Sequence, residues 1–229
     1  DRLREMVRLA AGMDHRGRIA ESSQARALAC LRRFGERLQH MHAGRVRVVG
    51  TNTLRHAKST GRFLQRAGRA LGHPVEIISG IEEARLIYLG ASHHLPRVDG
   101  PRLVVDIGGG STEIILGRGL DPTTMESLAL GCVSLSEGCF RGGRLSPRYF
   151  QQARLQARLE LEPVRTLFRK VAPAQVTGTS GSIRAAHAVL AALGRAPQGI
   201  TIEGLEYLIH EMTTAGSLDQ LRLPELSRE

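Results

Sequence analysis

The sequence predicts a mixed α/β protein of two domains, and three observations favour this fold class. Amphipathic helical segments alternate with short β-branched strands through the first ninety residues, a glycine-tipped pair of strands begins soon after, and further strand and helix patterns follow. At 229 residues, the chain is longer than one compact core usually needs. We therefore expect a first α/β domain over residues 1–90 and a second over residues 91–229.

The first domain is expected to begin with an amphipathic helix over residues 21–42, because its apolar residues recur at three- and four-residue spacing. Ser22 or Ser23 can cap its start. The later elements alternate: a strand over 46–49, a polar turn over 50–53, a helix over 58–71, a strand over 74–78 and a helix over 82–90. This alternation indicates a sheet layered with helices.

The second domain is expected to open with a β-hairpin. Residues 91–102 hold most of the local breakers, which places the domain boundary near residue 90. Two apolar strands, 103–107 and 112–116, then flank a glycine turn at 108–111. The remaining elements are a small-residue turn at 131–134, a helix over 146–170 interrupted at Pro163, a strand over 175–183 and a helix over 184–193.

The composition excludes several classes of protein. With 41% hydrophobic and 24% charged residues and no short repeat, the chain is neither fibrous nor of low complexity. No apolar run reaches the roughly 18 residues of a membrane span, and the start lacks an initiator Met and a signal peptide, so we expect the chain to begin within a longer protein. Three cysteines (Cys30, Cys132, Cys139) without C-x-x-C spacing indicate neither disulfides nor zinc, which favours a cytoplasmic location.

The charge is strongly basic and unevenly distributed. The formal net charge is +10, and 30 of the 32 basic residues are arginine, whose planar fork binds phosphate oxygens in pairs. Residues 1–60 hold 13 basic and 5 acidic residues. This concentration predicts a polyanionic partner. Nucleic acid is not expected, because the chain has no Trp and no arginine stretch interleaved with aromatic residues.

The glycine turn at 108–111 has the chemistry of a phosphate site. It is not a dinucleotide or Walker loop, since Glu113 stands where a last glycine is needed and no lysine follows. Three successive glycines expose backbone N–H groups that can converge on an anion. Asp106 before the turn and Glu113 after it can hold a hard cation such as Mg²⁺. The structural alternative is a tight turn with a solvated Glu113. This alternative does not explain why an aspartate ends an apolar strand beside three glycines.

Five ordered motifs give the chain a resemblance to a known family. They are Gly50-Thr51-Asn52-Thr53-Leu54-Arg55, the segment 78–87 (ISGIEEARLI), the segment 105–113 (VDIGGGSTE), the segment 130–134 (LGCVS) and Gly178-Thr179-Ser180-Gly181-Ser182. In this order they resemble the exopolyphosphatase / guanosine pentaphosphate phosphohydrolase family, nearer its exopolyphosphatase branch. The resemblance implies an actin/hexokinase/Hsp70-like (ribonuclease H-like) fold of two α/β domains with a central cleft.

The resemblance also implies an activity and a site. The expected reaction is Mg²⁺-dependent hydrolysis of terminal phosphoanhydride bonds of inorganic polyphosphate. Glu83 carries over as the base that orients water, with Asp106 and Glu113 holding the metal. On residues alone, Glu82 and Glu83 instead suit an exposed helix face with Arg85 as ion partner, and the resemblance reverses this for Glu83. The expected phosphate-binding residues are Thr51, Asn52, Thr53, Arg55, Gly108, Gly109, Gly110, Ser111, Ser180, Gly181 and Ser182.

Two of these phosphate-binding assignments have structural alternatives. Arg55 can instead cap carbonyl groups at a strand-to-helix turn, and Ser180 and Ser182 can serve only as helix N-caps. The Gly/Ser/Thr turn at 178–182 indicates a phosphate site only in combination with the glycine turn at 108–111.

Several related expectations complete the prediction. The family begins with a phosphate loop that precedes this sequence and ends with elements that follow it, so the chain is expected to be a fragment of a longer enzyme that forms a homodimer, in the cytoplasm or at the inner membrane face. Two alternatives stay open: hydrolysis of guanosine pentaphosphate, and a non-catalytic polyphosphate- or nucleotide-binding regulator. His93 and His94 are expected to be surface residues of the interdomain segment.

The basic residues near the start are expected to form a track for the polyphosphate tail. Five of its arginines cannot all reach one catalytic phosphate: Arg2, Arg4, Arg8, Arg45 and Arg47.

Overall fold

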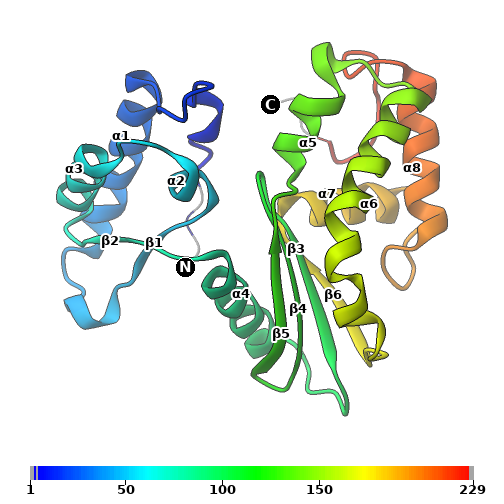
Figure 1. Ribbon diagram of the computed structural model, residues 1–229, viewed down its shortest axis with the longest axis horizontal. Coiled ribbons are helices and arrows are strands. Elements are labelled where there is room, and N and C mark those ends of the chain that lie inside the picture. Colours follow the sequence, from blue (N-terminus) through cyan, green and yellow to red (C-terminus); the bar gives the residue numbers. More distant parts are fainter. Residues whose placement is uncertain (1–2, 4, 227–229) are drawn as a thin grey trace. The chain divides into compact units, whose positions relative to one another are not determined.

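The computed structural model describes residue 3 and residues 5–226 (Figure 1). Contacts divide the chain into two compact units, Asp1–Gly80 and Ile81–Glu229. The α-helices and strands are α1 (Glu21–Leu38), β1 (Val48–Gly50), α2 (Asn52–His56), α3 (Gly61–Leu71), β2 (Val75–Ile77), α4 (Gly80–His94), β3 (Arg102–Ile107), β4 (Thr112–Arg118), β5 (Asp121–Leu128), α5 (Cys132–Cys139), α6 (Pro147–Arg169), β6 (Gln175–Thr179), α7 (Ser180–Ala192) and α8 (Ile202–Ala215). Short 3₁₀ turns cover Ala10–Gly12, Ala43–Arg45 and Arg141–Gly143.

The first unit is built on the packing of α1 against α3. Ala27 and Leu28 of α1 meet Phe63 and Ala67 of α3 in a buried cluster, as the apolar spacing of residues 21–42 and 58–71 predicted. The two helices approach closely at Gly35, where a Cβ atom would lie 2.6 Å from the Ala70 carbonyl oxygen. Glycine is therefore needed at this crossing.

A two-stranded parallel sheet completes the first unit. Val48 pairs with Val75 and Gly50 with Ile77. The backbone N–H of Ile78 donates to the Gly50 carbonyl at 3.1 Å, so the chain leaves both strands at the same end. The turn that follows β1 is tightened into the one-turn helix α2.

The second unit contains a four-stranded sheet in the order β5-β4-β3-β6. β3 and β4 pair antiparallel, which confirms the predicted hairpin over residues 103–116. β5 pairs antiparallel with β4, and β6 pairs parallel with β3. The mixed α/β class predicted from the sequence is confirmed by this arrangement.

α4 covers one face of this sheet. Its Ala84 and Tyr88 pack against Val104 of β3 and Ile115 of β4, and all four side chains are fully buried. Tyr88 lies directly over Gly117, where a Cβ atom would come within 2.5 Å of the ring. Because side chains alternate along a strand, Asp106 and Glu113 share the face that α4 covers.

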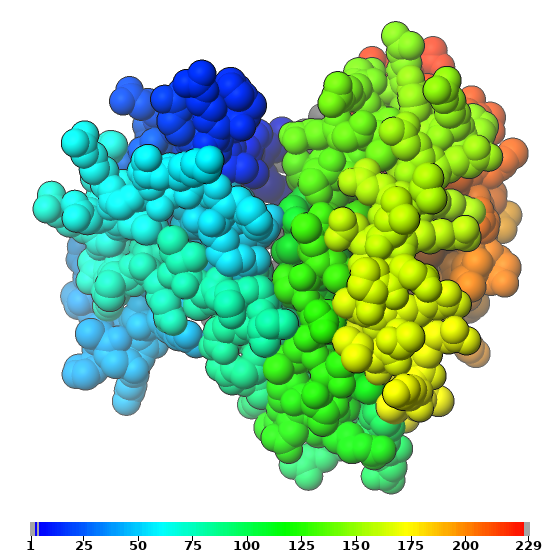
Figure 2. Space-filling view, viewed as in Figure 1, coloured from blue at the N-terminus to red at the C-terminus, as the bar shows by residue number. Residues whose placement is uncertain are grey.

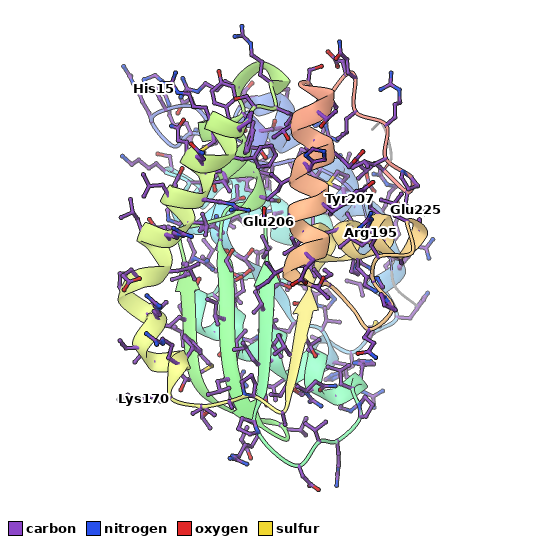
Figure 3. All side chains as sticks on the ribbon, turned by 90° about the vertical axis from the view of Figure 1, so that its right-hand side faces the viewer. His15, Lys170, Arg195, Glu206, Tyr207 and Glu225 are labelled. Atoms are coloured by element: carbon purple, nitrogen blue, oxygen red, sulfur yellow. The ribbon has the colours of Figure 1, made fainter. Side chains whose placement is uncertain are left out.

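The opposite face carries further helices, of which α6 and α8 lie side by side (Figures 1 and 3). An ion pair between Arg154 and Glu206 links α6 to α8. The Arg195 guanidinium stacks over the Tyr207 ring at 3.8 Å from its centre (Figure 3). Pro163 lies inside α6, which runs through it without a break.

Some boundaries differ from those expected. The contact-defined division follows Gly80, the first residue of α4, whereas the sequence placed the domain boundary near residue 90. α4 continues to His94, so His93 and His94 are exposed residues of a helix end and not of a linker. The first turn of α7 begins at Ser180, four residues before the expected start at Arg184. Within the described residues, no helix is long and apolar enough to cross a bilayer.

Candidate active site

A row of polar side chains crosses the sheet of the second unit near the glycine turn. Each member is the direct cross-strand partner of the next, from β5 through β4 and β3 to β6: Ser127, Glu113, Asp106 and Thr179. Partners that face each other across strands have side chains on the same face, with Cβ atoms about 5 Å apart. The sheet register therefore brings the two carboxylates expected from the sequence together.

Hydroxyl groups hold both carboxylates from the outer strands. Ser127 Oγ donates to Glu113 Oε1 at 2.8 Å. Thr179 Oγ1 donates to Asp106 Oδ2 at 2.5 Å. These contacts fix the orientation of each carboxylate. Neither Ser127 nor Thr179 was singled out for this role from the sequence, because only the cross-strand register reveals it.

Glu113 is a buried carboxyl group in a negative environment. Only 1% of its surface is exposed. Burial is the main cause that raises the pKa of Glu113, while the hydrogen bonds from Ser127 and Ser111 lower it and the charges of Glu83 and Asp106 raise it. Asp106 and Glu83 therefore both lie within electrostatic reach of Glu113. A cation would relieve their repulsion.

Glu82 and Glu83, adjacent in the first turn of α4, make different contacts. Glu82 receives two hydrogen bonds from Arg85, at 2.7 and 2.9 Å, which is the ion pair considered from the sequence. Glu83 instead acts electrostatically on Glu113. Residues adjacent on a helix point about 100° apart, so the two side chains face different surroundings.

The glycine turn packs against the first turn of α5 and the residue before it, Gly131. The carbonyl oxygen of Gly108 accepts from Cys132 N, and that of Gly109 accepts from Val133 N at 2.8 Å. A Cβ atom at Gly131 would lie 2.3 Å from the Gly110 nitrogen. Gly131 must therefore be glycine for the two loops to pack backbone against backbone, a requirement that the sequence did not reveal.

The amides of this turn remain available to a ligand. Gly108 N donates to the Ser111 carbonyl at 2.9 Å and closes the turn. Along the described part of the chain, the backbone N–H groups of Gly109, Gly110 and Ser111 have no partner. Three successive free amides beside a carboxylate pair have the character of an anion-binding nest.

The second Gly/Ser/Thr segment adjoins the same row. Thr179 ends β6, and Ser180, Gly181 and Ser182 form the first turn of α7. Ser180 has φ of +83°, in the left-handed region, and its buried Oγ has no hydrogen-bond partner within the described structure. Such strain is often retained at ligand sites.

The remaining predicted residues lie in the first unit. Thr51, Asn52 and Thr53 are half-buried around the start of α2. Arg55 Nη1 donates to the Ile78 carbonyl at 3.1 Å, the carbonyl-capping contact considered from the sequence. Of the proposed track, Arg47 forms a bidentate ion pair with Glu76, whereas Arg2 and Arg4 lie outside the described residues.

The residues present fit a magnesium ion held partly by substrate. Over residue 3 and residues 5–226, no three His, Cys, Asp or Glu side chains form an all-protein metal site. Mg²⁺ is usually bound through one or two carboxylates together with phosphate oxygens and water. The oxygen-only pair of Asp106 and Glu113, with mutual repulsion and free amides alongside, has that donor set.

Comparison with known proteins gives a consistent result. The profile of the Ppx/GppA phosphatase family matches residues 1–229. Similar solved structures are an exopolyphosphatase-like protein (27% identity, TM-score 0.72, 83% of this chain and 61% of that one) and the Aquifex aeolicus PPX-GPPA enzyme (25%, 0.71, 92% and 70%). An exopolyphosphatase from Cytophaga hutchinsonii is similar at 26% identity, with a TM-score of 0.72 over 86% of this chain and 62% of that one. The chain thus spans 61% to 70% of the length of these proteins and shares their fold.

Proposed function

The chain belongs to the Ppx/GppA phosphatase family, and from this premise we propose that it hydrolyses the terminal phosphoanhydride bond of linear inorganic polyphosphate and releases orthophosphate. One observation carries the proposal: the cross-strand carboxylate pair of Asp106 and Glu113 lies beside three free backbone amides, with Glu83 within electrostatic reach of Glu113. This combination suits a phosphate whose charge must be neutralised while water attacks it.

Asp106 and Glu113 would hold Mg²⁺, with Thr179 and Ser127 fixing their orientation. When bound, the ion supplies charge neutralisation at the phosphate oxygens. The amides of Gly109, Gly110 and Ser111 are proposed to donate to the terminal phosphate. We assign Ser180, Gly181 and Ser182 to further phosphate contacts in this unit, and Thr51, Asn52, Thr53 and Arg55 to phosphate contacts of the first unit.

Glu83 is proposed to orient the attacking water and to accept its proton. The water oxygen forms a bond to the terminal phosphorus as the bridging P–O bond breaks, and the shortened polyphosphate leaves with the bonding electron pair. Because Glu82 is engaged by Arg85, it does not compete for this role.

The test is release of orthophosphate by the intact protein with Mg²⁺, on long-chain polyphosphate and on guanosine pentaphosphate in parallel. Faster turnover of polyphosphate supports the proposed substrate. Faster turnover of the nucleotide would instead identify the chain as a guanosine pentaphosphate phosphohydrolase. Binding of either compound without orthophosphate release would contradict catalysis and support a regulator on the same fold.

A further inference from the structure

Three arginines line a surface cavity between the two main helices of the first unit. The cavity has a volume of about 280 Å³ and is lined by Arg32 of α1 and by Arg66 and Arg69 of α3, with Leu28 and Ala70 at its apolar base. We call these three arginines and the cavity the arginine groove. Residues 61–71 lie at the surface in Figure 2, and all three arginine side chains are exposed.

The groove has no internal counter-charge. Across the described residues, Arg32, Arg66 and Arg69 form no ion pair, unlike Arg33 and Arg47, which pair with Glu5 and Glu76. α3 itself contains no Asp or Glu. The groove therefore presents positive charge that an external anion can neutralise.

The three arginines of α3, two of which line the groove, are placed unfavourably for the helix alone. Arg62, Arg66 and Arg69 follow one face of α3, so Arg62 and Arg66 form a like-charged pair four residues apart. Arg62 also lies in the first turn, where the helix dipole disfavours a cation. The stripe from Arg62 to Arg69 extends about 10 Å along the helix axis, which suits an elongated anion better than a single phosphate.

We propose that the arginine groove binds a segment of linear inorganic polyphosphate. This inference rests on the proposed function for the identity of the anion and adds a second binding site, separate from the glycine turn, made entirely of first-unit residues. Arginine forks bind successive phosphate groups in pairs of hydrogen bonds. Nucleic acid suits the groove less well, because none of the described residues that line it is aromatic and Phe63 of α3 is buried.

The experiment is direct binding of long-chain sodium polyphosphate and of tripolyphosphate to the full chain, in EDTA, across a series of salt concentrations. The test variant is R66S/R69S, and the matched control is R97S/R118S, which removes two exposed arginines from the second unit. We expect R66S/R69S to raise the Kd for long chains about tenfold and to flatten its salt dependence, by analogy with other linear phosphate polymers. R66K/R69K should lie between this variant and the wild type, since it keeps the charge without the fork.

Tripolyphosphate affinity and the control variant should change by less than about twofold. An unchanged Kd for long chains in R66S/R69S, or an equal loss in R97S/R118S, would overturn the inference. A parallel loss of affinity for a duplex DNA oligonucleotide would assign the groove to polyanions in general and would also overturn it. If R66S/R69S does not fold, as judged by circular dichroism, R32S is measured in its place. This experiment measures binding and not hydrolysis. Binding without turnover would therefore contradict the proposed function but not the inference that the groove binds polyphosphate.

Discussion

Asp106 on β3 and Glu113 on β4 are direct cross-strand partners, and each accepts a hydrogen bond from a hydroxyl on the strand beyond it. The turn that connects β3 to β4 consists only of residues 108–111. One local element therefore fixes the carboxylates and the free amides relative to each other. The third carboxylate, Glu83, comes from a helix that packs on the same face through Ala84 and Tyr88. The site geometry of the second unit thus follows from the register of one hairpin and the seating of one helix.

Replacing Glu83 with Gln should lower kcat for orthophosphate release by roughly 10² or more, because the amide cannot accept the proton of the attacking water. The binding of polyphosphate should change little. Steady-state kinetics on long-chain substrate checks this. Glu82→Gln is the matched control, since it removes the neighbouring charge from a side chain engaged by Arg85, and it should retain most of the activity. Near-normal turnover in Glu83→Gln removes this residue from the mechanism.

Replacing Glu113 with Gln should make the metal-free protein more stable at neutral pH. The pKa of Glu113 is raised in the folded state by burial and by Asp106 and Glu83, so the fold favours the protonated form. Stability is then fully present below the unfolded pKa and declines as pH rises through the folded pKa. The amide stays neutral, so the variant avoids that decline.

Thermal unfolding in EDTA from pH 4 to pH 8 measures this effect. The Tm advantage of Glu113→Gln should grow with pH and disappear at the acidic end, while its activity is lost. A Tm difference that is independent of pH would show that the ionisation of Glu113 does not limit stability.

Much of this fold could be predicted from the sequence, because its periodic segments are long or strongly apolar. The hairpin at 103–116 and the helices α1 and α3 are of this kind. β5 was not anticipated, since Pro122 and the polar residues around it argue against a strand. The structure places Pro122 beside Gly117, next to a bulge in an edge strand, where a missing N–H is tolerated. Pro163 is likewise tolerated inside α6. Proline has no N–H to donate to the carbonyl of Leu159, four residues earlier, but Leu159 is 66% exposed, so water can hydrogen-bond to that carbonyl.

The site was less predictable because its supports come from elsewhere in the chain. Asp106 and Glu113 stand out as the ends of an apolar hairpin, but their partners Thr179 and Ser127 become visible only from the register of four strands. α5 and α8 were also not anticipated, although Thr201 caps the start of α8 and Gly216 ends it. Sequence periodicity carries no information on which loop packs against which, and this explains why the role of Gly131 was missed.

Replacing Gly131 with Ala should damage the glycine turn. The new Cβ would lie 2.3 to 2.4 Å from backbone atoms of Gly109 and Gly110, which cannot move aside as a side chain end can. We expect a loss of about 1–3 kcal/mol in the free energy of unfolding, the usual range for overpacking, and a larger fall in kcat/KM because the amides are displaced. Denaturant unfolding and phosphate release measure the two effects.

Gly90→Ala is the control for this substitution. Gly90 lies within α4, and no atom of the described residues outside its own helix turn lies within 4 Å of its Cβ position, so Ala should stabilise the protein by about 0.5–1 kcal/mol. If Gly131→Ala behaved in the same way as Gly90→Ala, the close packing of the two loops would be refuted.

Replacing Ser127 with Ala should raise the Mg²⁺ concentration needed for half-maximal activity by about tenfold, in the lower range for losing a contact that orients a metal ligand. Ser127 Oγ donates to Glu113 Oε1, and this hydrogen bond lowers the pKa of Glu113 against the effect of burial. Without it the carboxylate is less readily ionised and less firmly oriented, but its oxygens remain in place. Saturating Mg²⁺ should therefore restore most of kcat, and Ser127→Thr, which keeps the hydroxyl, should behave as the wild type.

Thr123→Val provides the comparison within the same strand. Thr123 Oγ1 donates to the Leu116 carbonyl at 3.1 Å, away from the carboxylates, so the variant removes a β5 hydroxyl of similar kind without touching the site. Its Mg²⁺ dependence should match the wild type. A purely structural role for Ser127 would lower kcat at every Mg²⁺ concentration and leave the midpoint unchanged, and that outcome would contradict the assignment of Ser127 as a positioning residue for Glu113.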